Sequence, residues 1–200
     1  MTKQTAAVLE SLSKSGLLLE QDKQHPNVAT LVTGESLRTS WWSHPKGRLI
    51  FRVLSELADH PDVLFTKLLY RKVTLVHRHL WPAFLAVASA GKPWQLRGLS
   101  ASGRRLLRSL NESKAAVRSS GPAVKELEVR LLAHSEEVHT ETGRHEIVVE
   151  PWHVWSKRVG AKPMRSIARA RQQLEESAAA IGAPLTALPW PSNRSNHDPR

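Results

Sequence analysis

Residues 114–150 constrain the fold of this chain more than any other stretch, because turn, helix and strand signals follow one another there in a definite order. Gly121-Pro122 breaks the chain, and Pro122 suits the first position of a helix, where no backbone N–H is needed. A strand-like run follows from 133 to 140, and a glycine-containing turn leads to a β-branched run at 146–150. The pattern predicts a helix followed by a β-hairpin.

Upstream of this stretch, Ser100 or Ser102 can cap a helix that runs through Leu110, and Ala115–Arg118 supplies about one further helical turn. Two helices, a third helix and a hairpin in this order are the helix-turn-helix core and wing of a winged-helix DNA-binding module. The alternative is an ordinary helix and hairpin in a small α+β domain. We therefore expect an α+β fold that is mainly helical, with two β-hairpins and a C-terminal winged-helix-like module.

The third helix of this module has an apolar face formed by Val124, Leu127 and Leu131, at spacings of three and four. Lys125 and Arg130 point away from that face and are available to a phosphate or a base edge. We expect this helix to be the recognition helix.

The charge of the chain favours a polyanionic partner. The net charge is +11 and the isoelectric point is near 10.6. Residues 97–130 carry eight basic and three acidic side chains, a net charge of +5 immediately before and within the recognition helix. We expect duplex DNA as the partner, bound by Arg104, Arg105, Arg108, Lys114, Arg118, Lys125, Arg130 and Arg144.

The predicted wing has the opposite charge. Residues 131–150 contain five glutamates and one basic residue, Arg144, for a net charge of −4. A wing that follows phosphates should be basic, because counterion release drives much of the affinity for DNA. Either this wing faces away from the nucleic acid, or the module binds a protein.

The composition excludes several classes of protein. The chain has no cysteine, so it forms no disulfide, thiolate metal site or cysteine nucleophile. No apolar run approaches the length of a membrane span, and no signal segment opens the chain. We expect a cytoplasmic bacterial protein that does not contact a membrane and holds no cofactor or metal.

An earlier unit precedes the module. A short helix is predicted at 35–42, a clear one at 46–58 with Ser43 as its cap, and a hairpin from 63–69 and 72–80. Trp41 and Trp42, next to His44-Pro45-Lys46, are the best candidate for a functional surface in this unit, whereas Trp81 and Trp152 suit a core.

The chain divides at polar or proline-containing stretches, and a long amphipathic helix is predicted to start at Pro163. A homodimer through this helix is a further expectation. The predicted units are 1–27 (N-terminal helix and linker), 28–96 (helix–hairpin–helix), 97–160 (winged-helix-like module), 161–182 (C-terminal helix) and 183–200 (flexible tail).

Histidines are the main source of potential catalysis. His77 and His79 share one strand face and, with His44, could form a metal or acid–base site. A second set, His134, His139 and His145 with Glu137 and Glu141, has the side chains of a zinc site but no standard ligand spacing. Backbone-bonded or solvated histidines are the more ordinary interpretation, and we expect no catalytic residue.

Three runs of the sequence, 40–47, 73–82 and 138–146, together resemble a family of uncharacterised bacterial proteins over residues 36–155. That resemblance implies no particular activity. The module at 103–150 is also similar to winged helices of transcription regulators and, distantly, of bacterial DNA glycosylases that unhook crosslinks. Those glycosylases share a Gln-x-Gln or Gln-x-Asp motif, whereas Gln21-Asp22 and Gln172-Gln173 here are adjacent pairs.

The function we expect is therefore DNA binding without catalysis, as a transcription regulator or an accessory DNA-repair factor. One alternative is an enzyme that acts on nucleic acid through the histidines of the first unit. The other is a winged helix that binds proteins, as the acidic wing would favour.

Overall fold

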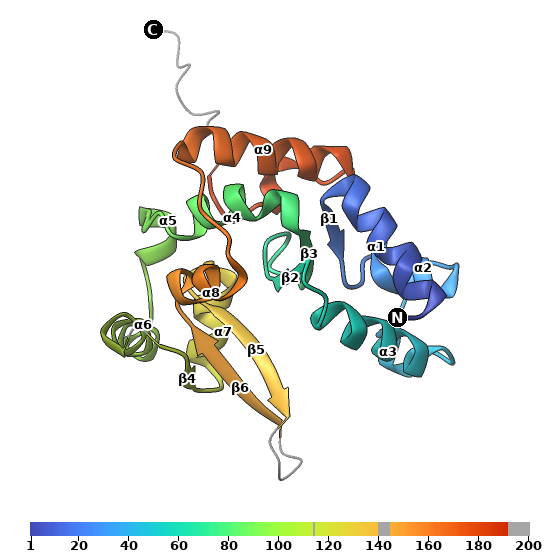
Figure 1. Ribbon diagram of the computed structural model, residues 1–200, viewed down its shortest axis with the longest axis horizontal. Helices are drawn as coiled ribbons and strands as arrows, with labels where there is room; N and C mark the ends of the chain where they lie inside the picture. The colour runs from blue at the N-terminus through green and yellow to red at the C-terminus, as the bar shows by residue number, and fades with distance from the viewer. Residues whose placement is uncertain (114, 140–144, 192–200) are drawn as a thin grey trace, which may run out of the picture.

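The computed structural model describes residues 1–113, 115–139 and 145–191 and has a mixed α+β fold, as predicted. Two small antiparallel sheets, with strand orders β1-β3-β2 and β4-β6-β5, belong to two separate units. In Figure 1 the first unit lies on the right and the second at the lower left, and helices α4 and α9 lie above and between them.

The first unit begins at the N-terminus. Its short strand β1 pairs antiparallel with β3, so that Leu17 lies opposite Val76. The predicted boundary at residue 27 is therefore wrong, because the N-terminal helix and strand belong to the same sheet and core as the rest of this unit. The unit consists of α1 (Lys3–Ser15), β1 (Leu17–Leu19), α2 (Val28–Thr33), α3 (Gly47–Ala58), β2 (Val63–Thr66) and β3 (Thr74–His77).

The hairpin of the first unit turns without glycine. Tyr70 and Arg71 both have positive φ angles, 53° and 58°, and the Lys72 N–H donates to the Leu69 carbonyl at 2.8 Å. Two consecutive left-handed residues are the geometry of the tight turn that suits a twisted hairpin. Leu68 and Leu69, just before the turn, are fully buried in the central core, whereas Tyr70, Arg71 and Lys72 of the turn are exposed.

The second unit contains the predicted helices and hairpin, with one correction. Residues 117–118 form a strand, not a helical turn, because Val117 and Arg118 pair with Val149 and Val148 of the last strand. Only one helix therefore stands between the first strand and the hairpin. The unit consists of α6 (Ala101–Ser113), β4 (Val117–Arg118), α7 (Pro122–Val129), β5 (His134–His139) and β6 (His145–Glu150).

A central helical layer joins the two units. Every residue of α4 (Trp81–Ala88) except Pro82 is buried, and α9 (Ile167–Ala180) packs along it through Ala170, Leu174 and Ala178. Trp81 and Trp152 lie in this core, as predicted, and are 3% and 4% exposed. The layer also includes α8 (Trp152–Val159), the short α5 (Pro93–Leu96) and the 3-10 turns η2 (Arg78–Leu80) and η3 (Leu185–Ala187).

The C-terminal predictions need two corrections. Helix α9 begins at Ile167, after the Ser166 side chain accepts a hydrogen bond from the Arg169 N–H, and not at Pro163. Residues 183–191 are not a loose tail, because Leu188 and Trp190 are buried in the central core. Residues 192–200 of the predicted tail lie outside the described part of the chain.

Candidate nucleic-acid interface

The predicted DNA-binding residues of α6 lie on its surface. Arg104, Arg105 and Arg108 are exposed. The Arg104 guanidinium donates to the carbonyl of Leu99, immediately before the helix. Arg105 and Arg108 form no hydrogen bond or ion pair through their side chains within the described residues, so both are free to bind an anion.

The two cations predicted to point outward from α7, Lys125 and Arg130, lie in different environments. Lys125 is exposed, and Val124 and Leu127 are buried on the opposite face, as predicted. Arg130 points back to the end of α5, where its Nη1 lies 2.7 Å from the Arg97 carbonyl oxygen and 3.2 Å from that of Gln95. Arg130 therefore satisfies backbone carbonyls, and the prediction that it is directed outward is wrong.

The other predicted DNA-binding residues add no further unpaired cation within the described part of the chain. Arg118 is exposed, but its Nε lies 2.8 Å from Glu146 Oε2 on the neighbouring strand. Lys114 and Arg144 lie outside the described residues. Among the described residues, the second unit thus leaves Arg105, Arg108 and Lys125 available.

Helix α3 of the first unit presents a second basic surface, which the sequence predictions did not assign to DNA. One face of α3, including Ile50, Val53 and Leu57, is buried. The opposite face carries Arg48, Phe51, Arg52 and Ser55, all exposed and spaced at three, four and seven residues. The same periodicity that identified the buried stripe could have identified this outward face.

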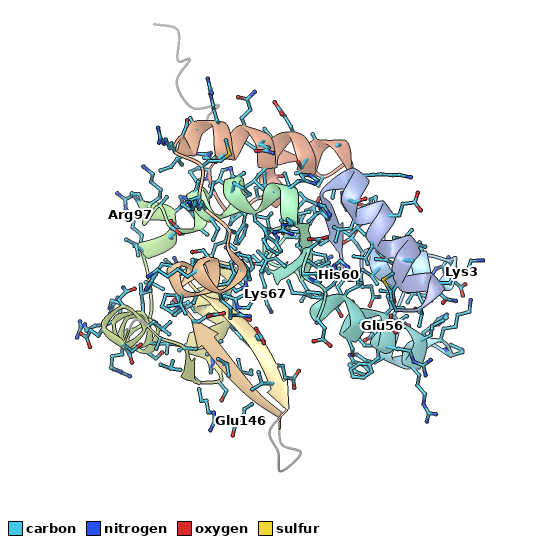
Figure 2. The ribbon with its side chains drawn as sticks, in the orientation of Figure 1. Lys3, Glu56, His60, Lys67, Arg97 and Glu146 are labelled. Atoms are coloured by element: carbon cyan, nitrogen blue, oxygen red, sulfur yellow. The ribbon has the colours of Figure 1, made fainter. Side chains whose placement is uncertain are left out.

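The carboxylate of α3, Glu56, forms its hydrogen bonds with the N-terminus and interacts with Arg52 only electrostatically. Arg48 forms no ion pair or hydrogen bond through its side chain within the described residues. Glu56 is directed to the N-terminus, where its Oε2 accepts from the Thr2 N–H and the Thr5 hydroxyl, both at 2.7 Å. The hydrogen bond from Thr5 is the main cause that lowers the pKa of Glu56. Figure 2 shows Glu56 on the α3 side of the first unit.

An aromatic pair adjoins the basic face of α3. Trp41 and Trp42 form the 3-10 turn η1 (Trp41–Ser43), and residues 35–40 are not the predicted helix. Trp41 is 5% exposed, whereas Trp42 is 67% exposed. Lys46, and not the predicted Ser43, precedes the first residue of α3, and neither side chain caps the helix.

The histidines of the first unit do not form the predicted three-residue site. The Nδ1 atoms of His77 and His79 lie 2.8 Å apart. Burial is the main cause that lowers the pKa of His77, and the neighbouring His79 lowers it further. His44 instead lies 3.2 Å from Glu35. No metal-binding group that includes these histidines is found among the described residues.

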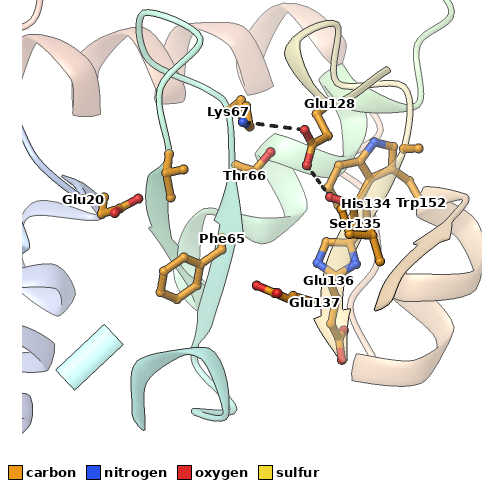
Figure 3. Close-up of a pocket in the computed structure, with 13 residues that line it drawn as sticks. Glu20, Phe65, Thr66, Lys67, Glu128, His134, Ser135, Glu136, Glu137 and Trp152 are labelled. Atoms are coloured by element: carbon orange, nitrogen blue, oxygen red, sulfur yellow. Dashed lines mark hydrogen bonds and ion pairs between the residues drawn. The ribbon is translucent and has the colours of Figure 1, made fainter. Parts of the chain in front are cut away.

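A pocket of about 400 Å³ lies between the two units. Figure 3 shows Phe65, Thr66 and Lys67 on one side and residues 134–137 of β5 on the other. Lys67 forms an ion pair with Glu128 at 3.6 Å. Four glutamates and one lysine line the pocket, so acidic side chains outnumber basic ones there, although Glu128 pairs with Lys67 and Glu136 with Arg158. The lining glutamates are Glu20, Glu128, Glu136 and Glu137.

His134, at the edge of this pocket, is not a solvated wing residue. Its Nδ1 lies 3.2 Å from Glu150 Oε1, and the two side chains are 8% and 6% exposed. Arg158 of α8 donates to the same Glu150 oxygen and to Glu136. Burial by itself would raise the pKa of Glu150, but the hydrogen bonds from His134 and Arg158 outweigh it and lower that pKa.

His134, Glu136 and Glu150 each place one ligand atom within 4.8 Å of the others, which is close enough to hold a metal ion. Arg158 already contacts both carboxylates and supplies the positive charge that an ion would bring. The zinc set predicted from sequence differs from this group. The side chains of His139 and His145 lie outside the described part of the structure, as does Glu141.

Comparisons with protein families, curated proteins and solved structures gave no match for this chain. The resemblances drawn from the sequence therefore stay predictions. Among the helices described, none is long and apolar enough to cross a membrane.

Proposed function

We propose that this chain is a winged-helix protein that binds duplex DNA, with α3 as its main DNA-contacting helix. The observation that carries the proposal is the outward face of α3. Arg48 and Arg52 lie there with their side chains exposed, on a helix whose opposite face is fixed in a core. A rigid helix with free guanidinium groups suits the major groove, where arginine contacts phosphates and guanine edges.

The order of elements supports this assignment. The first unit runs helix, strand, helix, helix, strand, strand, and its first strand pairs with its last. This is the order of a winged helix. The second unit has the same strand order but only α7 between its first and second strands, where the first unit has both α2 and α3. The first unit is therefore the better candidate for recognition, although the sequence pattern favoured the second.

The distribution of charge also favours α3. The predicted wing of the second unit has a net charge of −4, and four glutamates but one lysine line the pocket beside it. Phosphates would be repelled from that side, whereas the chain as a whole carries +11. Arg105, Arg108 and Lys125 can extend the interface without using the acidic hairpin.

The role we propose is that of a transcription regulator or an accessory DNA-repair factor that does not itself catalyse a reaction. A homodimer through the C-terminal helix gains no support, because the apolar side of α9 packs on α4 of the same chain. The second candidate function is binding of a protein partner, which the acidic hairpin favours.

The test is the binding of a short fluorescent DNA duplex, measured by anisotropy at low salt. The parent protein should bind, and the double variant Arg48→Ala with Arg52→Ala should bind much more weakly. The matched control is Arg165→Ala with Arg169→Ala, which also removes two exposed charges whose side chains have no partner among the described residues. We expect the control to bind nearly as well as the parent.

A third double variant, Arg105→Ala with Arg108→Ala, compares the two units directly. A loss larger than that of the α3 variant would assign the main contact to the second unit and contradict the proposal for α3. If the parent protein binds no duplex at low salt, the DNA-binding proposal itself fails.

A further inference from the structure

Trp42 combines one stacked indole face with a large solvent-exposed surface. It stacks on Trp41 with ring centroids 4.0 Å apart and an angle of 23° between the ring planes. One indole face is thus covered, yet 67% of the residue remains exposed, so the opposite face is open to solvent. Phe51 of α3, which is 48% exposed, lies 5.6 Å away and widens the aromatic surface.

Trp42 stacks on Trp41, which is itself held in place by hydrogen bonds. The Trp41 indole N–H donates to Glu20 Oε1 at 2.5 Å, and the Trp41 backbone N–H donates to Gln21 at 3.0 Å. Gly47 allows the turn to lie against α3, because an added Cβ would come within 3.0 Å of the Trp41 carbonyl oxygen. A preformed aromatic surface loses little conformational freedom when a ligand binds.

Cationic residues lie on the same helix as Phe51 and immediately before it. Lys46 immediately precedes α3, and Arg48 and Arg52 flank Phe51 along the outward face of the helix. The Lys46 ammonium group donates to the carbonyl oxygen of Thr33, the last residue of α2, at 2.9 Å. Flat rings beside positive charges match a ligand that combines phosphates with flat bases.

We infer that Trp42 and Phe51 form a stacking platform for an unpaired base of DNA, next to a duplex held by α3. This inference rests on the proposed function. Paired bases inside a duplex present only their edges in the grooves, and their faces are covered by neighbouring base pairs. A base that is bulged or lies in a single-stranded overhang has a free face. The preferred ligand is therefore DNA in which a duplex adjoins an unpaired base.

The experiment compares two labelled DNAs of equal length, one a perfect duplex and one with a single bulged base. The parent protein should bind the bulged DNA at least about fivefold more tightly, since one stacked base contributes at least that factor. Trp42→Ala should abolish this preference and keep the affinity for the perfect duplex. Trp42→Phe should retain part of the preference, because a smaller ring can still stack.

Leu31→Ala is the matched control, because Leu31 is an exposed apolar residue of the same unit, 45% exposed, that has no ring. It should keep the full preference. Equal affinity of the parent for both DNAs would overturn the stacking inference but leave duplex binding intact. A Trp42→Ala variant that keeps the preference would also overturn it. The inference would also fail if Trp42→Ala changed the self-association of the protein, measured by sedimentation, but not its binding to either DNA. Failure to bind either DNA would reject both proposals.

Discussion

At the scale of single residues, Arg130 donates hydrogen bonds to carbonyl groups at the end of α5. Its guanidinium reaches the carbonyls of Arg97, Gln95 and Trp94, and Glu126 lies 3.8 Å from its Nε. The three carbonyls are more than 30 positions away in sequence, and no local pattern at 122–132 could have placed them. Lys125, whose direction depends only on the helical period, was predicted correctly.

Arg130→Ala should lower the free energy of unfolding by about 1–3 kcal/mol, because it leaves several carbonyls without their charged donor. Urea unfolding measures this value. Arg108→Ala removes the same charge from an exposed site and should change stability by less than about 0.5 kcal/mol. If Arg130→Ala is as stable as the parent but binds DNA poorly, the structural role of Arg130 is wrong.

Glu150 should make stability depend on pH. Because its folded-state pKa is lowered, its contribution is complete above the ordinary glutamate pKa of about 4.3 and is lost as pH falls through the lower folded value. The parent should therefore exceed Glu150→Gln in stability most at neutral pH, and the gap should narrow in acid. Urea unfolding of both proteins across this range tests the prediction. A gap that stays constant down to a pH of about 3 would contradict it.

At the scale of elements, long periodic segments were predictable and short ones were not. The patterns for α1, α3, α6 and α7 carry enough periodic residues to be recognised, and α4 and both hairpins stand out as apolar or β-branched runs. Strand β1 is only Leu17–Leu19, buried throughout, so it has no alternation of apolar and polar residues. Helix α2 is only six residues long and was not predicted; in the structure the Asn27 side chain caps its start and Gly34 ends it.

Helix α7 should depend on Leu127, which is fully buried in the core of the second unit. Leu127→Ala should lower the free energy of unfolding by about 2–4 kcal/mol through the cavity it leaves. Leu96→Ala is the control, because Leu96 is 43% exposed and its loss should cost little. Thermal or urea unfolding measures both variants. Equal stability of the two would show that α7 is not packed as described.

At the scale of the whole molecule, the two units share a core that no local pattern could reveal. Leu17 and Leu19 of the first unit, Leu131 of the second and Trp190 near the C-terminus belong to one buried cluster. The pocket site was equally unpredictable, because His134 meets Glu150 across paired strands and Arg158 from the following helix. The basic face of α3, by contrast, could be read from residues 47–58 alone.

The salt dependence of duplex binding tests the central claim most directly. The logarithm of the binding constant should fall linearly with the logarithm of salt concentration for the parent protein. If Arg48 and Arg52 each contact a phosphate, replacing both by alanine should make the slope shallower by about 2, since each lost contact contributes about 1. The Arg165→Ala, Arg169→Ala control should keep the parent slope. An unchanged slope in the Arg48→Ala, Arg52→Ala variant, or an equal change in the control, would contradict the assignment of α3 as the DNA-contacting helix.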